Sequence, residues 1–487
     1  MSTQLPILLF LIPFIAGVAL PMATAKHRHW CQPITLTAVA FMTVMAILNL
    51  QVVLTQGPME YALGGWAAPV GIAWLNDSLA ALVVLTVSGV ALLTLLYGRQ
   101  VTSPTLEGSM AYYTLLLMLV SGLVGIVFAA DLFNVFVFLE VSALAAYALV
   151  GANGGKSAVY AFRYLLLGSL GATLYLLGVA HLYVATGTLN MADLATRIPA
   201  LMTSTAVAGG LIYIFLGLSI KMALIPLHGW LPDAYQNAPN PVTPLLAATV
   251  TKVSLVAWVR IEYSLILPGV EVSAVPVLVL LEEVGVIAAI VGGALALIQT
   301  DLKRMFAYGG IGHVGLILVG VSLGNATGFA GGLFYLLNDA VMQAALFMIA
   351  GSLLHLHKVR TLDELRDMAK PSPWLTGALI VVAVGMVGLP PTGGFFGKWN
   401  IVLGALEAEH YLAAFSVVAS TLLTLGYFIK VFACWFHRPH SDDTDVPLMR
   451  PSLTASLGLA SVAMVALGVF SDPIFSLLVS FMDSGIT

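Results

Sequence analysis

The chain has 487 residues, of which 60% are hydrophobic and only 9% charged, and its formal net charge is −4. So little charge excludes a soluble protein of this length and indicates a polytopic membrane protein. The small net charge gives no reason to expect a nucleic-acid partner. The two cysteines, Cys31 and Cys434, both map to the predicted cytoplasmic side, so we expect no disulfide, and without metal-ligand spacing we expect no metal site.

Long apolar runs predict about fourteen transmembrane helices, at about twenty residues per span. The runs are continuous and not alternating, which favours helices over barrel strands. Residues 1–487 are therefore predicted to form one transmembrane domain of the all-α class. The spans are expected to begin near Leu5, Ile34, Leu79, Ala111, Leu132, Ala158, Ala206, Val242, Val275, Leu302, Ala330, Leu375, Leu412 and Leu453.

Basic residues between the spans indicate the cytoplasmic side of the membrane. With fourteen spans, nearly all of them fall on one side: Lys26, Arg28, Arg99, Lys156, Arg163, Lys303, Arg304, Lys358, Arg360, Arg366, Lys370, Lys430, Arg438 and Arg450. Arg197 and Arg260 fall on the other. We therefore expect a multi-pass protein of the cell inner (cytoplasmic) membrane with both termini outside, and the first apolar run is expected to be retained as a span.

Two lysines lie inside successive apolar runs: Lys221 in LIYIFLGLSIKMALIPL and Lys252 in LLAATVTKVSLVAWV. A lysine at such depth costs at least a few kcal/mol, so it needs a partner, a watery cavity or a neutral state. Snorkelling to the headgroups is the alternative, but each lysine lies about ten residues into its run, which disfavours it. Pro226 breaks the first run soon after Lys221, and interrupted helices are where transporters bind ions.

Glu140 lies about nine residues into the run DLFNVFVFLEVSALAAYALV, whose first residue, Asp131, can cap the helix. A lone carboxylate at that depth is expected to hold a proton. Beside a lysine, both groups can stay charged. We favour an ion pair between Glu140 and Lys221 over a neutral Glu140.

A second broken helix is predicted in GMVGLPPTGGFFGKWNIVLGAL, where a proline pair and a glycine pair precede Lys398. Two broken helices at corresponding places suggest two inverted five-helix repeats. The first repeat would cover residues 110–262 (spans 4–8) and the second residues 273–436 (spans 9–13). This division rests on the layout of the spans, since the two segments show no convincing residue-level similarity.

Four further titratable residues lie at membrane depth. His313, among the glycines of AYGGIGHVGLILVG, suits a proton relay and a satisfied core position equally well. The others are Glu282, Glu283 and Asp339. At least one of these three carboxylates is expected to face a polar cavity.

Two connections between spans carry structural signals. The segment MEYALGGWAAPVGIAWLND is too short and glycine-rich to cross the membrane and is predicted to form a hairpin over the helix ends. TLDELRDM is predicted to begin a short surface helix.

Taken in order, these motifs resemble the antiporter-like subunits shared by respiratory complex I, membrane-bound hydrogenases and the multisubunit Mrp sodium/proton antiporters. The resemblance extends over nearly the whole chain. It rests on DLFNVFVFLE, KMALIPLHGWLPDAY with His228, TKVSLVAWVR, DLKRMFAYGGIGHVG and GLPPTGGFFGKW. The stretch TGTLNMADL looks most like the D-type branch of the Mrp subunits.

The resemblance implies the fourteen-helix fold with two inverted repeats. It also implies a charge-switching Glu140–Lys221 pair, a hydrated axis continued by Lys252 and His313, and exchange with one face of the membrane at Lys398. This chain has Gln343 where relatives often carry a lysine, and Glu282 and Glu283 are not expected there. These departures bear on the ion stoichiometry and on the route through the second half.

Three functions are compatible with these features. The first is a subunit that moves protons in exchange for sodium or another monovalent cation, together with other membrane subunits of an Mrp-type complex in the lipid bilayer. The second is a proton-pumping subunit of a complex I-like or hydrogenase-like redox complex. The chain has no flavin fingerprint and no iron–sulfur cysteine pattern, so we expect no cofactor in this subunit and any redox step in its partners. The third, a scaffold that has lost transport, would predict loss of the buried charges, which this chain retains.

Overall fold

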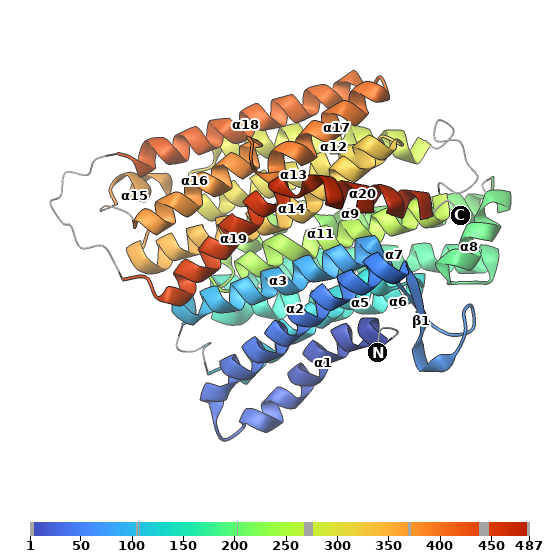
Figure 1. Cartoon of the computed structure of the whole chain (residues 1–487), viewed down its shortest axis with the longest axis horizontal. Helices are drawn as coiled ribbons and strands as arrows, with labels where there is room; N and C mark the ends of the chain where they lie inside the picture. Colours follow the sequence, from blue (N-terminus) through green and yellow to red (C-terminus); the bar gives the residue numbers. More distant parts are fainter. Residues whose placement is uncertain are drawn as a thin grey trace.

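The computed structural model describes residues 4–103, 106, 108–201, 203–266, 276–368, 372–437 and 448–484, which form a bundle of long helices (Figure 1). Thirteen helices in this described part are long and apolar enough to cross a membrane. A further predicted crossing, from Leu375, is split into the shorter helices α16 (Pro373–Val387) and α17 (Gly393–Glu407). The predicted all-α fold with about fourteen crossings is confirmed.

The first half of the chain forms α1 (Leu5–Thr24), α2 (Cys31–Gln56), α3 (Ser78–Val101), α5 (Met110–Phe128), α6 (Leu132–Val150), α7 (Lys156–Thr186), α8 (Met191–Arg197), α9 (Thr205–Met222), α10 (Leu231–Asn237) and α11 (Thr243–Ile261). The second half continues with α12 (Pro276–Ile298), α13 (Leu302–Ser322), α14 (Ala326–Ser352), α15 (Leu362–Arg366), α16, α17, α18 (Tyr411–Trp435), α19 (Pro451–Val469) and α20 (Ser471–Ser484). The π-helical turns η6 (Glu262–Ile266) and η8 (Leu353–His357) extend α11 and α14.

Short acidic side chains cap two of these helices, and the cap at Asp131 was predicted from the sequence. Asp131 accepts a hydrogen bond from the Asn134 N–H at 2.8 Å, and Asp77 caps α3 in the same way. Asp77 has a second role that capping did not reveal, since its carboxylate lies 2.8 Å from Arg260 and both side chains are buried. The ion pair ties the start of α3 to the end of α11.

The two predicted connections are also present. Strands β1 (Met59–Ala62) and β2 (Ala73–Asn76) pair antiparallel, with Met59 opposite Asn76, and form the hairpin before α3. The surface helix α15 begins with a capping box in which Glu364 accepts hydrogen bonds from the N–H groups of Arg360 and Thr361. These bonds lower the pKa of the Glu364 carboxyl.

Both predicted helix breaks are present, and each places a lysine at a helix end. The helix α9 ends at Met222, Ala223 has a left-handed backbone (φ +57°), and α10 begins only at Leu231. Lys221 therefore lies in the last turn of α9 and not in the middle of a continuous helix. The second break separates α16 from α17, and Lys398 lies in the second turn of α17.

The two breaks fall at matching places. In residues 110–262 the broken crossing, α9 with α10, is the fourth of five, and in residues 276–436 the broken crossing, α16 with α17, is again the fourth of five. Five is odd, so the second set starts from the opposite side of the membrane. This matching supports the predicted inverted repeats, whose division stays a prediction. The predicted boundary at residue 273 lies outside the described residues, as do Lys370 and Arg438.

Glycines let neighbouring helices approach closely in both halves of the chain. Gly171 and Gly178 of α7 face Gly217 and Gly210 of α9. In the second half, Gly285 and Gly292 of α12 face Gly315 and Gly312 of α13. Small residues at such crossings are typical of membrane helix packing, where close contact replaces the hydrophobic effect.

We expect Gly217→Ala to destabilise the protein by about 1–3 kcal/mol, because the new methyl group would overpack the α7–α9 crossing. A Cβ at position 217 would lie 2.5 Å from the Gly171 carbonyl oxygen, so α7 would have to move. Gly209→Ala on the same helix is the matched control, since nothing lies within 4 Å of its Cβ. Heating the detergent-purified protein before size-exclusion chromatography would compare the two. Equal midpoints would contradict tight packing at this crossing.

Candidate functional site

Glu140 of α6 and Lys221 of α9 lie side by side at the first break. The Lys221 Nζ is 3.3 Å from Glu140 Oε1, and it also donates to the Tyr147 hydroxyl at 3.2 Å. The Lys221 side chain is only 5% exposed, whereas Glu140 is 28% exposed. The carboxylate lies on the outward face of α6, which also carries the exposed side chains of Phe133, Val137 and Leu144.

Lys252, Asp339 and His313 form a second charged group, completely inside the bundle. The Asp339 carboxylate lies 2.7 Å from Lys252 Nζ through one oxygen and 2.7 Å from His313 Nδ1 through the other. The three side chains come from α11, α14 and α13, and Asp339 is 0% exposed. One carboxylate therefore compensates the charge of a lysine and orients a histidine.

Lys398 lies at the second break and is held by a helix end. Its Nζ donates to the carbonyl oxygens of Met386 at 2.7 Å and Val387 at 3.2 Å, in the last turn of α16. These carbonyls have no partner further along their own helix, and the C-terminal end of a helix favours a positive charge. In the described part of the chain no carboxylate lies within ion-pair distance of this ammonium.

A small cavity and the ring of Tyr335 lie beside neighbouring members of these three groups. A cavity of about 10 Å³, enough for about one water molecule, is lined by Met222, next to Lys221, and by Lys252. At the other end, the ring of Tyr335 lies near both His313 and Lys398: its centre is 5.6 Å from the His313 ring and 5.8 Å from Lys398 Nζ. We call Glu140, Lys221, Lys252, Asp339, His313 and Lys398 the buried row.

Three of the predicted site residues lie apart from the buried row. His228 lies in the first break, with its ring 6.0 Å from the Tyr308 ring, and no hydrogen bond or ion pair of the described residues joins it to a buried lysine. Glu282 pairs with His410 at 2.5 Å, and Glu283 is exposed. Gln343 lines the small cavity beside Lys252.

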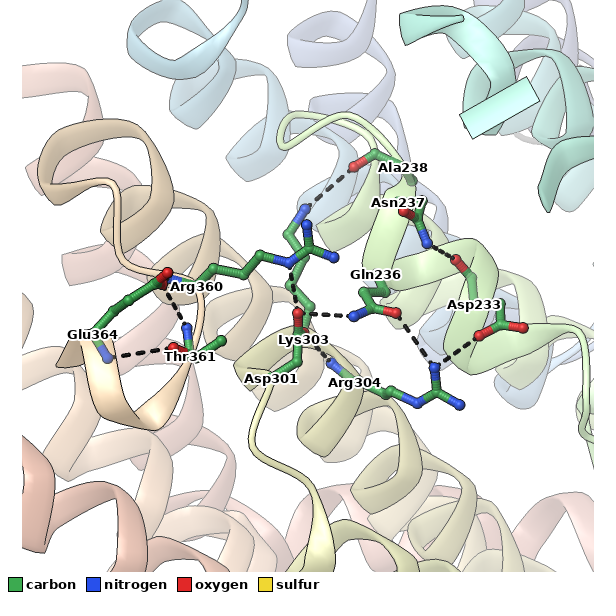
Figure 2. Close-up of polar contacts among 10 residues, drawn as sticks. All are labelled: Asp233, Gln236, Asn237, Ala238, Asp301, Lys303, Arg304, Arg360, Thr361 and Glu364. Carbon is green, nitrogen blue, oxygen red and sulfur yellow. Dashed lines mark hydrogen bonds and ion pairs between the residues drawn. The ribbon is translucent and has the colours of Figure 1, made fainter. Parts of the chain in front are cut away.

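A polar cluster at the end of the bundle with the basic loops joins α10, α13 and the start of α15 (Figure 2). Arg304 donates to Asp233 at 3.0 Å, and Asp301 accepts from Gln236 at 2.8 Å and from Arg360 at 2.6 Å. Lys303, in the first turn of α13, points into the bundle and donates to the Ala238 carbonyl oxygen at 3.2 Å. The charge rule counted Lys303 as a loop residue, but its side chain is buried.

The sequence did not single out two tyrosines beside the buried row or the buried side chain of Lys303. Tyr147 accepts a hydrogen bond from Lys221, and Lys398 Nζ lies 5.8 Å from the centre of the Tyr335 ring; Tyr147 belongs to the run that carries Glu140, but nothing in that run marked the tyrosine as a partner. Lys303 could have been found, because the first-turn position after the capping residue Asp301 already places it on a helix.

Comparison with known proteins identifies the group to which the chain belongs. Residues 129–424 match the family described as "NADH:quinone oxidoreductase/Mrp antiporter, TM". This is more than half of the chain and includes the whole buried row. The chain belongs to this family. It is an antiporter-like membrane subunit, and the predicted resemblance is confirmed.

Individual family members point to more than one kind of complex. The chain is 41% identical to the N-type subunit of the NADH-quinone oxidoreductase of Desulforudis audaxviator, over 88% of this chain and 86% of that protein. It is 32% identical to the D-type subunit of the Na(+)/H(+) antiporter of Alkalihalophilus pseudofirmus, over 97% of this chain and 95% of that protein. A chain in the structure of the membrane-bound sulfane sulfur reductase, an archaeal respiratory membrane complex, superposes with a TM-score of 0.91 at 29% identity, covering 99% of this chain and 98% of that one. Family members therefore occur in multisubunit membrane complexes.

Proposed function

We propose that this chain is the proton-conducting subunit of an Mrp-type multisubunit cation/proton antiporter, with sodium or another monovalent cation as the exchanged ion. The observation that carries the proposal is the charge balance of the buried row. It holds three lysines but two carboxylates, so with neutral His313 and every other group ionised it carries one net positive charge. Loss of one proton from any lysine makes the row neutral, and such a row can hold and release a mobile proton at low cost.

Movement of the Glu140–Lys221 pair would drive the transfer. At an effective dielectric near 20, opposite charges about 4 Å apart attract by roughly 4 kcal/mol, and by far less once several ångströms further apart. A closed pair favours protonated Lys221. An opened pair leaves the ammonium buried without compensation and favours release of its proton towards Lys252. Because Glu140 lies partly exposed on the outer face of α6, a neighbouring protein of the complex could open or close the pair.

The orientation of the chain is part of the proposal. We place the protein in the inner membrane, with both termini outside and the basic loops in the cytoplasm. Protons would leave the row near Lys398 at the second break, and the exchanged cation could be carried by this chain or by a partner.

A second candidate is a proton-pumping subunit of a redox complex, and a specific observation favours it. The 41% identity to a NADH-quinone oxidoreductase component exceeds the 32% identity to the antiporter component, although the latter covers more of the chain. In such a complex the same buried row would move protons, and an electron-transfer partner would supply the energy.

Purified complex in sealed vesicles separates the two candidates. With a pH-sensitive dye inside and no electron donor, antiport predicts that addition of sodium or potassium chloride moves protons across the membrane. If protons move only when an electron donor is supplied, the redox complex is the correct assignment. If the fully assembled complex moves no protons under either condition, proton conduction itself is wrong.

Within this function, Lys398→Ala is expected to lower proton flux about a hundredfold, the scale typical for loss of a proton-transfer group. The matched control is Lys430→Ala. Lys430 also donates to helix-end carbonyls, those of Leu297 at 2.6 Å and Gln299 at 3.4 Å, but lies at the end with the basic loops and outside the buried row. Vesicles with the two variants should differ in flux while both assemble. Normal flux with Lys398→Ala would remove the second break from the pathway.

A further inference from the structure

A cavity of about 420 Å³ opens at the end of the bundle with the basic loops and has a buried lysine in its wall. Seven of the fifteen residues around it are amides or basic residues, among them Asn153, Asn240, Lys303, His355 and Arg360, and most of the others are apolar. Asn153 and Arg360 are exposed, whereas Lys303 is only 5% exposed. The cavity therefore leads from the surface to an ammonium inside the protein.

Lys303 has no carboxylate within ion-pair distance in the described part of the chain. Its Nζ donates to the Ala238 carbonyl oxygen at 3.2 Å and the Thr243 hydroxyl at 3.3 Å. The charged or titratable groups that face it are Asp301, Arg360 and His355, and Asp301 is already bound by Arg360 and Gln236. A buried ammonium without a paired anion is costly, so this amine is stable only with water beside it or without its proton.

The Lys303 side chain also reaches α11, the helix that carries Lys252 of the buried row. Thr243 is the first residue of α11, and Lys252 lies further along the same helix. The small cavity of about 10 Å³ beside Lys252 is also lined by Ala247 and Thr251. Ala247 follows Thr243 by about one helical turn, or roughly 6 Å along the axis. One turn of α11 thus separates Thr243, which the Lys303 side chain reaches, from the water-sized cavity beside Lys252.

We propose that the large cavity is the port through which the buried row exchanges protons with the aqueous phase on the side of the basic loops, and that Lys303 is its proton-collecting residue. The inference rests on the proposed function. A hydronium ion in the cavity gives a proton to the neutral Lys303 amine and is left as water. The Lys303 ammonium then gives a proton to the Thr243 oxygen, which releases its own hydroxyl proton to water, and water along one turn of α11 carries a proton to the cavity beside Lys252; no bond other than N–H and O–H bonds forms or breaks.

Binding of an anion, such as the phosphate of a lipid headgroup, is the competing use of this cavity. Both cations facing it already have protein partners, since Lys303 donates to two oxygens of the chain and Arg360 donates to Asp301. Because both cations already bind oxygens of the protein, a proton port is favoured over an anion site.

The first test asks whether water reaches the cavity from one side, independently of transport. Asn240→Cys, in a complex carrying Cys31→Ala and Cys434→Ala, is expected to react with a membrane-impermeant maleimide added on the side of the basic loops and not on the other. Thr249→Cys is the matched control on α11, because Thr249 is buried away from the cavity. Labelling of Asn240→Cys from the opposite side, or no labelling from either side, would overturn the port.

The second test changes the pH on one side of oriented vesicles. Lys303→Gln is expected to lower proton flux at least about tenfold, and acidifying the basic-loop side by one or two pH units should restore most of it. Acidifying the other side should not. A merely structural lysine would give a loss that neither side restores. The inference is contradicted if Lys303→Gln causes no loss of flux, or if recovery of the flux does not depend on which side is acidified.

These outcomes separate the inference from the function on which it rests. If Lys221→Ala abolishes flux and Lys303→Gln does not, the function stands and the port is wrong. If the wild-type complex moves no protons, the function fails, whereas the cysteine labelling still reports the cavity.

The anion alternative is correct if wild-type flux depends on phosphatidylglycerol in phosphatidylethanolamine vesicles, or on inorganic phosphate, and Lys303→Gln removes that dependence. Dependence on the lipid alone would identify a headgroup site, and dependence on free phosphate would identify a soluble anion.

Discussion

Lys221→Ala is expected to abolish proton flux while the complex still assembles. The lysine is the buried member of a pair whose carboxylate is 28% exposed, so Glu140 still reaches the outer face of the bundle, where a partner protein can contact it, when Lys221 is removed. Lys221→Arg should fail too, because a guanidinium keeps its proton at any physiological pH and cannot act as a donor. Flux in vesicles with purified variants is the measurement. Undiminished flux with Lys221→Ala would remove the centre of the proposed mechanism.

The same vesicles can show whether Glu140 and Lys221 act as one unit. Glu140→Gln should weaken flux strongly, and Glu140→Asp should weaken it less or shift its pH optimum. The double variant Glu140→Gln, Lys221→Ala should be no worse than the worse single variant, because coupled residues give non-additive losses. Clean additivity of the two losses would contradict a coupled pair.

The sequence predicted the crossings and both breaks because they depend on local properties. Apolar runs of bilayer length predict helices wherever they occur, and the prolines near Lys221 and before Lys398 interrupt hydrogen bonding within a few residues. The Glu140–Lys221 contact could also be predicted, since two opposite charges at membrane depth stabilise each other. What the sequence could not supply was the helix end at Met222, which places Lys221 at the break.

The role of Asp339 could not be separated from those of Glu282 and Glu283 by depth alone. All three carboxylates lie inside apolar segments, but their partners come from other helices. Asp339 meets Lys252 of α11 and His313 of α13, whereas Glu282 meets His410 and Glu283 is exposed. Such partners depend on the rotation of packed helices, which the spacing of residues in one segment does not fix. Lys303 was missed for a related reason, since counting charges between spans ignores the direction of each side chain.

Asp339→Asn is expected to be the most damaging single change to stability, by about 3–5 kcal/mol, because breaking a buried ion pair leaves uncompensated charge inside the protein. The carboxylate is 0% exposed and lies 2.7 Å from both Lys252 and His313. Asparagine keeps the shape but not the charge. The yield of assembled complex and its thermal midpoint should both fall, and proton flux per assembled complex should be lost. Glu283→Gln is the control, and a neutral change of this exposed carboxylate is expected within about 0.5 kcal/mol.

A second variant distinguishes loss of charge balance from loss of shape. Adding Lys252→Met to Asp339→Asn removes the cation that the aspartate compensated, so the region is neutral again and assembly should recover most of the lost stability. Flux should not recover, because the row has lost a proton carrier between Lys221 and Lys398. If the double variant remains as unstable as Asp339→Asn, the aspartate stabilises the helices through its hydrogen bonds and not by balancing Lys252. If flux returns with assembly, protons do not pass through Lys252, and the buried row cannot be the conducting path.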